Sequence, residues 1–357
     1  MRLISRRNRI TRAAVTVAVV ALAAAGCGES SKSANTGGDK ESGTYSGKGI
    51  GLAYDIGGEG DQSFNDAAHA GFVKADKDFG IGGQTFEPAD GESEADKAQR
   101  IENLAKQGYN PVIGVGYIYA PAIKEAAAKY PDTTFGIIDD ESVTAKNVAS
   151  LVFSEEQASY LAGVAAASAS KTDTVGFIGG VDIPLIHKFG AGFEQGAKSV
   201  DPKVKVIKKI LTSTAQEGGF SSPDKGREAA NGQIEAGADV LYHAAGLSGQ
   251  GVISEAAKNK VWAIGVDSDQ YKQDALKEYK DYILGSATKN VDGMVYELAK
   301  SVHEGKPLSG TIRGDLKSNG VSFADSNPKY KEMTEVVEAV EKAKKDIIDG
   351  KVTVKTS

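Results

Sequence analysis

Cysteine is almost absent from this chain of 357 residues: Cys27 is the only one, so no disulfide can close within the molecule. The four histidines lie far apart in the sequence and form no pattern of metal ligands. Neither a Gly-x-Ser-x-Gly turn nor a phosphate-binding Walker loop occurs. These absences argue against a metalloenzyme, a serine hydrolase and a nucleotide hydrolase, and we expect no cofactor.

Long apolar runs are missing after the first 25 residues, and none of the later ones approaches the length that spans a bilayer. Basic residues are outnumbered by acidic ones. The first 26 residues contain five arginines and no acid, so the formal net charge of −6 for the whole chain becomes −11 without them. An acidic body of this kind is a poor candidate for binding nucleic acid.

The first residues combine an arginine-rich start, an apolar run over 13–25 and then Cys27. This layout predicts a signal peptide over residues 1–26 and lipid attachment at Cys27. The segment resembles the lipobox of bacterial lipoproteins, except that Ala24 stands where leucine is usual. Cleavage by an ordinary signal peptidase, which would release a secreted protein, is the alternative. Residues 5–7 hint at twin-arginine export.

Residues 27–46 are small, polar and without periodicity, which is typical of a flexible tether. The remaining length exceeds one comfortable hydrophobic core and favours two domains. We therefore expect a folded body that is held at the outer face of a cell membrane by its lipid and does not cross the membrane.

Short apolar segments alternate with helical patterns along this body. Strands that are apolar on both faces and alternate with helices form parallel sheets, so the pattern predicts an α/β fold. The expected strands are 50–55, 84–88, 112–116, 134–139, 149–153, 174–179, 204–211, 240–245, 261–267 and 282–289. The expected helices are 65–79, 94–107, 120–129, 155–169, 188–200, 225–236, 251–258 and one long terminal helix, 330–348.

A weak internal repeat divides this pattern into two halves. The tripeptide Ala-Gly-Phe recurs at 70–72 and 191–193, each time in the first helix after the first strand of its half. Two similar doubly wound lobes explain the repeat, although chance similarity between ordinary strand–helix units is an alternative. Ligands bind open parallel sheets at the carboxyl ends of their strands, and these ends are rich in aspartate and glycine here. The pattern therefore predicts a polar cleft between two lobes.

The segment 61–66 follows the first strand and leads into a helix. Phe64 offers a ring for stacking, while Asp61 and Asn65 offer hydrogen bonds to a polar ligand. Structural roles are open as well, because Asn65 is a plausible N-cap and Phe64 could pack against its own helix. Paired carboxylates elsewhere in the chain have no nucleophile beside them, so binding is favoured over catalysis.

Four motifs, in order, resemble the basic membrane protein family of lipoproteins, which includes a purine nucleoside receptor. They are GGEGDQSFND at 57–66, FGIID at 135–139, DIPL at 182–185 with FGAGF at 189–193, and AIGVDSDQ at 263–270. The resemblance implies a type I periplasmic-binding-protein fold, with two doubly wound parallel-sheet lobes joined by a hinge. It assigns 47–143 with 270–308 to the N-terminal lobe, and 144–269 with 309–357 to the C-terminal lobe.

The resemblance also implies a ligand site. Its expected residues are Asp61, Phe64, Asn65, Tyr117, Asp139, Phe220, Gly246, Asp267 and Lys289. Two rings, Phe64 and Phe220, would sandwich a nucleobase, and Tyr117 and Tyr119 could replace or supplement Phe220. Other side chains would bond the edge of the base, and Asp267 with Lys289 would hold the ribose hydroxyls. A salt bridge across the hinge is the alternative role of that last pair.

Together with the resemblance, these patterns predict a monomeric, lipid-anchored solute-binding protein, and the resemblance implies that it delivers a nucleoside, purine being favoured, to the permease and ATPase subunits of an ABC importer. Three acids against one lysine disfavour a phosphorylated ligand. The alternatives are a receptor for a sugar or a sugar-derived signal, and a surface signalling lipoprotein without a transport role. An enzyme would have to turn over the bound nucleoside.

Overall fold

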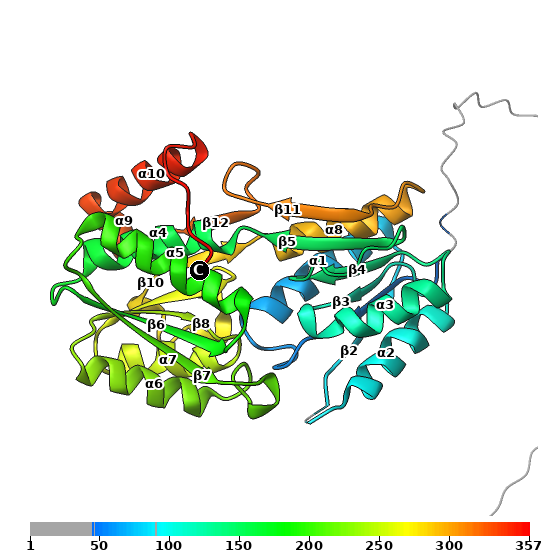
Figure 1. Cartoon of the computed structure of the whole chain (residues 1–357), viewed down its shortest axis with the longest axis horizontal. Helices are drawn as coiled ribbons and strands as arrows, with labels where there is room; N and C mark the ends of the chain where they lie inside the picture. The colour runs from blue at the N-terminus through cyan, green and yellow to red at the C-terminus, as the bar shows by residue number, and fades with distance from the viewer. Residues whose placement is uncertain (1–44, 46, 90) are drawn as a thin grey trace, which may run out of the picture. The chain divides into compact units, whose positions relative to one another are not determined.

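A computed structural model describes residues 45, 47–89 and 91–357. The predicted signal peptide, Cys27 and all of the predicted tether except residue 45 lie outside the described residues. The described residues belong to one compact unit. This unit contains two α/β lobes, each built around a six-stranded sheet (Figure 1).

The sheet of the N-terminal lobe is entirely parallel. Its strands, in spatial order, are β11 (Gly310–Gly314), β5 (Val148–Phe153), β4 (Phe135–Ile138), β3 (Val112–Gly114), β1 (Ile50–Ala53) and β2 (Gly83–Phe86). The four central strands are fully buried, as their continuous apolar sequences require when helices cover both faces.

The sheet of the C-terminal lobe is parallel except for one edge strand. Its strands, in spatial order, are β12 (Val321–Ala324), β10 (Ile283–Lys289), β9 (Trp262–Asp267), β8 (Val240–Ala244), β6 (Thr174–Val181) and β7 (Lys205–Thr212). Only β12 runs antiparallel, beside β10.

The two sheets share one strand order. Within each lobe the second strand lies outside the first, and the third, fourth and fifth follow on its other side. This is the doubly wound order whose switch point, between the first and third strands, forms a ligand crevice. The predicted fold class and the internal repeat are therefore confirmed.

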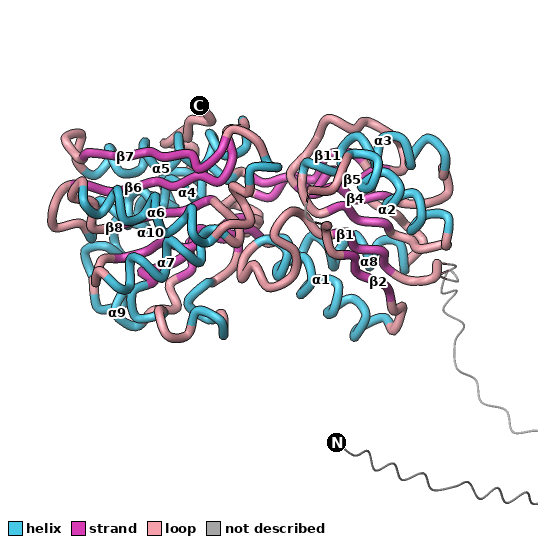
Figure 2. Tube along the Cα trace, turned by 90° about the horizontal axis from the view of Figure 1, so that it is seen from below, coloured by secondary structure: helices cyan, strands magenta, loops and turns pink. Residues whose placement is uncertain are grey.

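Helices cover both faces of each sheet, as Figure 2 shows for the strands (magenta) between helices (cyan). The N-terminal lobe contains α1 (Phe64–Phe79) packed on α8 (Val291–His303), and α2 (Glu94–Lys106) packed on α3 (Ala120–Lys129). The C-terminal lobe contains α4 (Glu155–Ala169), α5 (Pro184–Val200), α6 (Pro223–Glu235), α7 (Ser248–Lys258), α9 (Pro328–Glu332) and α10 (Thr334–Ile348). Separate apolar clusters fill the two sides of the first sheet.

The chain crosses between the lobes three times: between β5 and α4, between β10 and α8, and between β11 and β12. The predicted lobe boundaries differ from the sheets at three strands. Strands β5 and β11 pair in the N-terminal sheet, and β10 pairs in the C-terminal sheet. The predicted boundaries misassign these three strands because a strand joins whichever sheet edge it can pair with. Strand pairing depends on residues that are far apart in the sequence.

All ten predicted strands are present, while β11, β12 and α8 were not predicted. The predicted terminal helix over 330–348 is wrong in one respect, because it breaks at Met333 into α9 and α10. Tyr330 buries its ring beside Phe323, whereas Val336 begins the buried stripe of α10. Val336 lies six positions after Tyr330, so these two side chains would point about 120° apart on one straight helix. A break lets both be buried.

Candidate functional site

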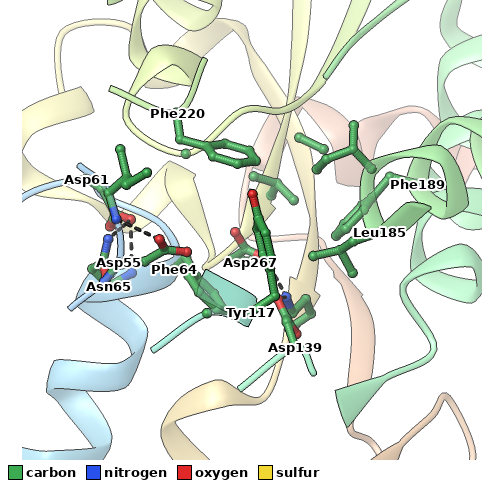
Figure 3. Close-up of a pocket in the computed structure, with 17 residues that line it drawn as sticks. Asp55, Asp61, Phe64, Asn65, Tyr117, Asp139, Leu185, Phe189, Phe220 and Asp267 are labelled. Atoms are coloured by element: carbon green, nitrogen blue, oxygen red, sulfur yellow. Dashed lines mark hydrogen bonds and ion pairs between the residues drawn. The ribbon is translucent and has the colours of Figure 1, made fainter. Parts of the chain in front are cut away.

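One cavity between the lobes is lined by all nine residues that the sequence predicted for the ligand site (Figure 3). Three of them, Asp61, Phe64 and Asn65, come from the loop after β1 and the start of α1. Tyr117 and Asp139 follow β3 and β4 of the same lobe. The other four, Phe220, Gly246, Asp267 and Lys289, come from the C-terminal lobe. Both lobes therefore contribute to one site.

Three of these residues have left-handed backbones at the carboxyl ends of strands. Asp139 follows β4 with φ 63°, Asp267 ends β9 with φ 62°, and Gly246 follows β8 with φ 53°. Aspartate tolerates this conformation better than most side chains, but it remains a strained choice that clusters at functional sites. The sharp turns hold both carboxylates at the cleft instead of along the sheets.

Lys289 lies between the carboxylates of the two lobes. Its Nζ is 2.5 Å from Asp139 Oδ2 and 3.5 Å from Asp267 Oδ1. The three side chains are only 3, 4 and 8% exposed for Lys289, Asp139 and Asp267. Burial opposes the charge on the lysine, but the carboxylates around it raise its pKa above the ordinary value. The predicted alternative of a salt bridge at Lys289 is thus present, mainly with Asp139.

Each carboxylate of this cluster keeps one oxygen without a hydrogen bond. Asp139 Oδ1 and Asp267 Oδ1 are buried and have no hydrogen-bond partner, and Asp267 Oδ1 is the oxygen that faces the Lys289 ammonium at 3.5 Å. Burial raises the pKa of Asp139, although Lys289 beside it acts in the opposite direction. Buried polar atoms nearly always have partners, so two free acceptors in one cavity indicate a place for donors of a ligand.

The carboxylate of Asp61 accepts hydrogen bonds from its own loop and from the start of α1. Its oxygens accept hydrogen bonds from the backbone N–H groups of Ser63, Asn65 and Asp66 at 2.9–3.2 Å. They also accept one from the Asn65 amide at 3.1 Å. Because α1 begins at Phe64, Asn65 is not the N-cap that the sequence suggested as its structural role. The donors at the start of α1 are satisfied by Asp61 instead.

Asn65 ties this loop to the end of β1, since its Oδ1 accepts the backbone N–H of Asp55 at 2.8 Å. One hydrogen of its amide is taken by Asp61. The amide therefore keeps one further hydrogen for a ligand.

Four aromatic rings border the cavity, those of Phe64, Tyr117, Phe189 and Phe220. Figure 3 shows Phe220 projecting from the C-terminal lobe toward Tyr117 and Phe64. The ring of Phe220 lies so close to Gly180 that a Cβ there would be 2.4 Å from it. The Lys289 ammonium is 4.6 Å from the centre of the Phe64 ring, a cation–π distance. Tyr119, by contrast, is buried and donates its hydroxyl to the carbonyl of Tyr54.

The cavity has eight further lining residues that the sequence did not assign to the site. They are Asp55, Ile56, Gly116, Leu185, Ile186, Phe189, Ala244 and Val266. Asp55 and Gly116 lie at polar strand ends, Leu185 and Phe189 lie in the third motif, and Val266 lies in the fourth, so the sequence carried a signal for these five. The others are ordinary apolar residues. Burial raises the pKa of Asp55 to about 7.

Among the described residues, no group of histidine, cysteine, aspartate or glutamate is arranged to hold a metal ion. Within the same part of the chain, no helix combines the length and apolar character needed to span a membrane.

Comparison with known proteins agrees with this geometry. The model of the Bmp family, described as ABC transporter substrate-binding protein PnrA-like, matches residues 51–356. A solved ABC transporter solute-binding protein from Aeropyrum pernix superposes with a TM-score of 0.73 at 24% identity, covering 87% of this chain and 93% of that one. This second likeness concerns the fold, and it confirms the periplasmic-binding-protein architecture.

Two curated relatives are similar over most of their length. The ABC transporter nucleoside-binding protein BmpA of Lactococcus lactis is 37% identical, over 85% of this chain and 88% of the relative. An uncharacterized lipoprotein of Pyrococcus horikoshii is 34% identical, over 84% of this chain and 78% of the relative. The chain therefore belongs to the Bmp family of ABC transporter substrate-binding proteins, and it is not an enzyme.

Proposed function

We propose that this protein binds a nucleoside, with purine nucleosides preferred, as the receptor of an ABC importer. Its family implies a small-molecule ligand and partner permease and ATPase subunits. The observation that carries the proposal is a buried lysine between two carboxylates with free oxygens, in a cavity bordered by aromatic rings. A nucleoside has the complementary groups, namely a flat base and a neutral diol.

In this proposal the ribose lies at the Asp267–Lys289 end of the cavity. The free oxygen of Asp267 accepts hydrogen bonds from two neighbouring hydroxyls, while the ammonium of Lys289 donates to their oxygens. Gly246 offers its backbone, and its φ of 53° suits the close approach of a ligand.

The base lies among the aromatic rings in the same arrangement. Stacking on rings such as Phe64 and Phe220 contributes about 1–3 kcal/mol per base. The free oxygen of Asp139 accepts a hydrogen bond from the edge of the base, and the second amide hydrogen of Asn65 donates one.

Phosphorylated ligands fit this cavity poorly. Asp139 and Asp267 line it, and Glu155, with a side chain only 2% exposed, lies close enough for the charge of Asp139 to raise its pKa. Lys289 is the one basic residue among the lining residues. A nucleotide would bring at least one more negative charge to a site that already has an excess of carboxylates.

The proposal agrees with the name of the Lactococcus lactis relative, which is described as nucleoside-binding. It also agrees with the two-lobe architecture, because a ligand that touches both lobes stabilises the closed state by its differential affinity.

We expect nucleosides to stabilise the protein against heat. The sample is the chain lacking residues 1–27, since both sheets and the cavity lie within the later, compact unit. A nucleoside at a hundred times its dissociation constant should add about 2.7 kcal/mol to the free energy of unfolding. Thermal-shift measurements would compare nucleosides, free bases, nucleotides and pentoses. A shift with a sugar and none with any nucleoside would contradict the proposal.

We also propose that Cys27 is the site of a lipid anchor on the outer face of the cell membrane. Support comes from the signal-like residues 1–26, from the absence of another cysteine, and from the relative named as a lipoprotein. Cells fed an alkyne-tagged palmitate should label the full chain and retain it in the membrane fraction. Cys27→Ala should lose both the label and the retention. Equal labelling of Cys27→Ala, or an unlabelled parent chain, would rule the anchor out.

A further inference from the structure

Gln270 connects the two lobes, yet it does not line the cavity. It is completely buried, and it lies three residues after Asp267. Its Oε1 accepts the backbone N–H of Val266 at 3.1 Å and the Nε2–H of His243 at 2.9 Å. Its Nε2 donates across the lobes to the carbonyl of Gln62 at 3.0 Å. One amide group thus joins β8 and β9 to the loop that precedes α1.

That loop is docked on the C-terminal lobe, although β1 and α1 on either side of it belong to the N-terminal lobe. Gln62 itself has a strained left-handed backbone with φ 57°. Next along the chain, Ser63 donates its hydroxyl to Asp267 Oδ2 at 2.8 Å and accepts the Ser268 hydroxyl on its carbonyl at 2.8 Å. The following residue is Phe64, whose ring borders the cavity.

We propose that Gln270 is a positioning residue, which holds the Gln62–Phe64 turn of one lobe against the Asp267 end of the other. In this role it sets the separation of the lobes and makes Phe64 and Asp267 face the same ligand. The expected effect of Gln270 on ligand affinity rests on the proposed nucleoside binding. Its expected effect on the separation of the lobes does not.

The same bonds within the C-terminal lobe could give Gln270 a purely structural role there, so a test must separate the two. Gln270→Glu does this, because a carboxylate still accepts from Val266 and His243. It loses the N–H that reached Gln62 and sets an anionic oxygen against the Gln62 carbonyl. At lower pH the carboxyl group becomes protonated, and its O–H can restore the bond to Gln62.

Gln233 supplies a matched control. It is 3% exposed, and its amide donates to the carbonyls of Phe177 and Ile207, both within the C-terminal lobe. Gln233→Glu therefore makes the same chemical change at an equally buried glutamine without touching the contact between the lobes.

The experiment measures lobe separation directly. The chain without residues 1–27 contains no cysteine, so spin labels can be attached at Asn103→Cys on α2 and Glu228→Cys on α6, both exposed. Distances between the labels are measured by pulsed electron paramagnetic resonance without ligand at pH 7 and pH 5. In the parent protein His243 stays neutral at both values, because burial lowers its pKa to about 4. The parent is measured at each pH as the reference, because burial raises the pKa of Asp61, in the docked loop, to about 7.

At pH 7 we expect Gln270→Glu to lengthen and broaden the distance distribution relative to the parent protein, and pH 5 to reverse most of this change. Titration with inosine, adenosine and guanosine should show affinity about tenfold weaker at pH 7, with the same recovery. Gln233→Glu should leave the distances unchanged. A parent-like distribution for Gln270→Glu at pH 7, no reversal at pH 5, or an equal change in Gln233→Glu would overturn the inference. Failure of all three nucleosides to bind the parent protein would instead overturn the proposed function.

Discussion

Replacing Asp267 with asparagine should weaken nucleoside binding about a hundredfold or more and leave the fold intact. Asparagine fills the same space and can accept the Ser63 hydroxyl that Asp267 accepts at 2.8 Å. It also tolerates the left-handed backbone at this position, φ 62°, far better than alanine does. The variant therefore removes the negative charge and little else.

The size of the effect follows from the two ribose hydroxyls assigned to this carboxylate. Hydrogen bonds to charged groups contribute roughly 1.5–3 kcal/mol each, so the loss of two corresponds to about a hundredfold or more in the dissociation constant. Isothermal titration with the nucleoside that gives the largest thermal shift would measure it.

Asp269 provides the matched control for Asp267. It lies two residues further along the same turn, where it accepts the Ser326 hydroxyl and pairs with Lys272, and it does not line the cavity. Asp269→Asn should leave affinity within about threefold, since the Lys272 partner is largely exposed. Unchanged affinity in Asp267→Asn would remove Asp267 from the ligand site.

Replacing Lys289 with methionine should destabilise the protein by about 3–5 kcal/mol at pH 7, because it leaves buried carboxylates without their counter-charge. The side chains of Asp139 and Asp267 are 4 and 8% exposed, so water cannot take the place of the ammonium. Methionine matches the length of the lysine chain, which limits the loss of packing.

The loss of stability in Lys289→Met should become smaller as pH falls from 7 to 5. Burial already raises the pKa of Asp139, and Lys289 is the main group that opposes this, so the pKa rises further in the variant. A folded state with a raised carboxyl pKa keeps a proton that the unfolded chain releases above about pH 4. Stability conferred by such a group is present at low pH and is lost as pH rises.

Urea unfolding at pH 5, 6 and 7 would measure this, with the parent protein as reference at each pH. The reference is needed because burial raises the pKa of Asp55 and Glu155 to about 7, which gives the parent a dependence of the same sign. Lys188→Met is the control: its ammonium is 3.9 Å from Glu155 and its side chain is 30% exposed, so about 1 kcal/mol or less is expected. An equal loss for Lys289→Met at all three pH values would contradict the explanation.

The secondary structure of this protein was largely predictable from its sequence, because it depends on short-range patterns. All ten predicted strands are present, and the predicted ends of α3 and α4 match the structure. The missed strand β11 is short, mostly exposed and polar, and it is a strand only because the edge beside β5 is free. The missed break at Met333 has a similar origin, since it depends on which surfaces α9 and α10 meet.

The candidate site was predictable at the level of its members but not of their contacts. Asp61, Phe64 and Asn65 could be recognised after the first strand, and the resemblance to the basic membrane protein family implied the rest of the set. The cavity contains all nine predicted residues. The groups with which these side chains form hydrogen bonds and ion pairs could not be recognised from the sequence. Lys289 pairs with Asp139, which is 150 residues away, and Asp61 serves the start of α1.

The order of strands and helices, the acidic balance of the body, and the aspartates, glycines and rings at the strand ends could be predicted from the amino-acid sequence. These depend on residue type and on neighbours close in the chain. The folded molecule was needed to show which sheet β5, β10 and β11 join, and which carboxylates share Lys289. The bond by which Gln270 links the lobes likewise became evident only in the fold. The physical reason is that pairing in a sheet, burial of charge and hydrogen bonding between lobes join groups that only folding brings together.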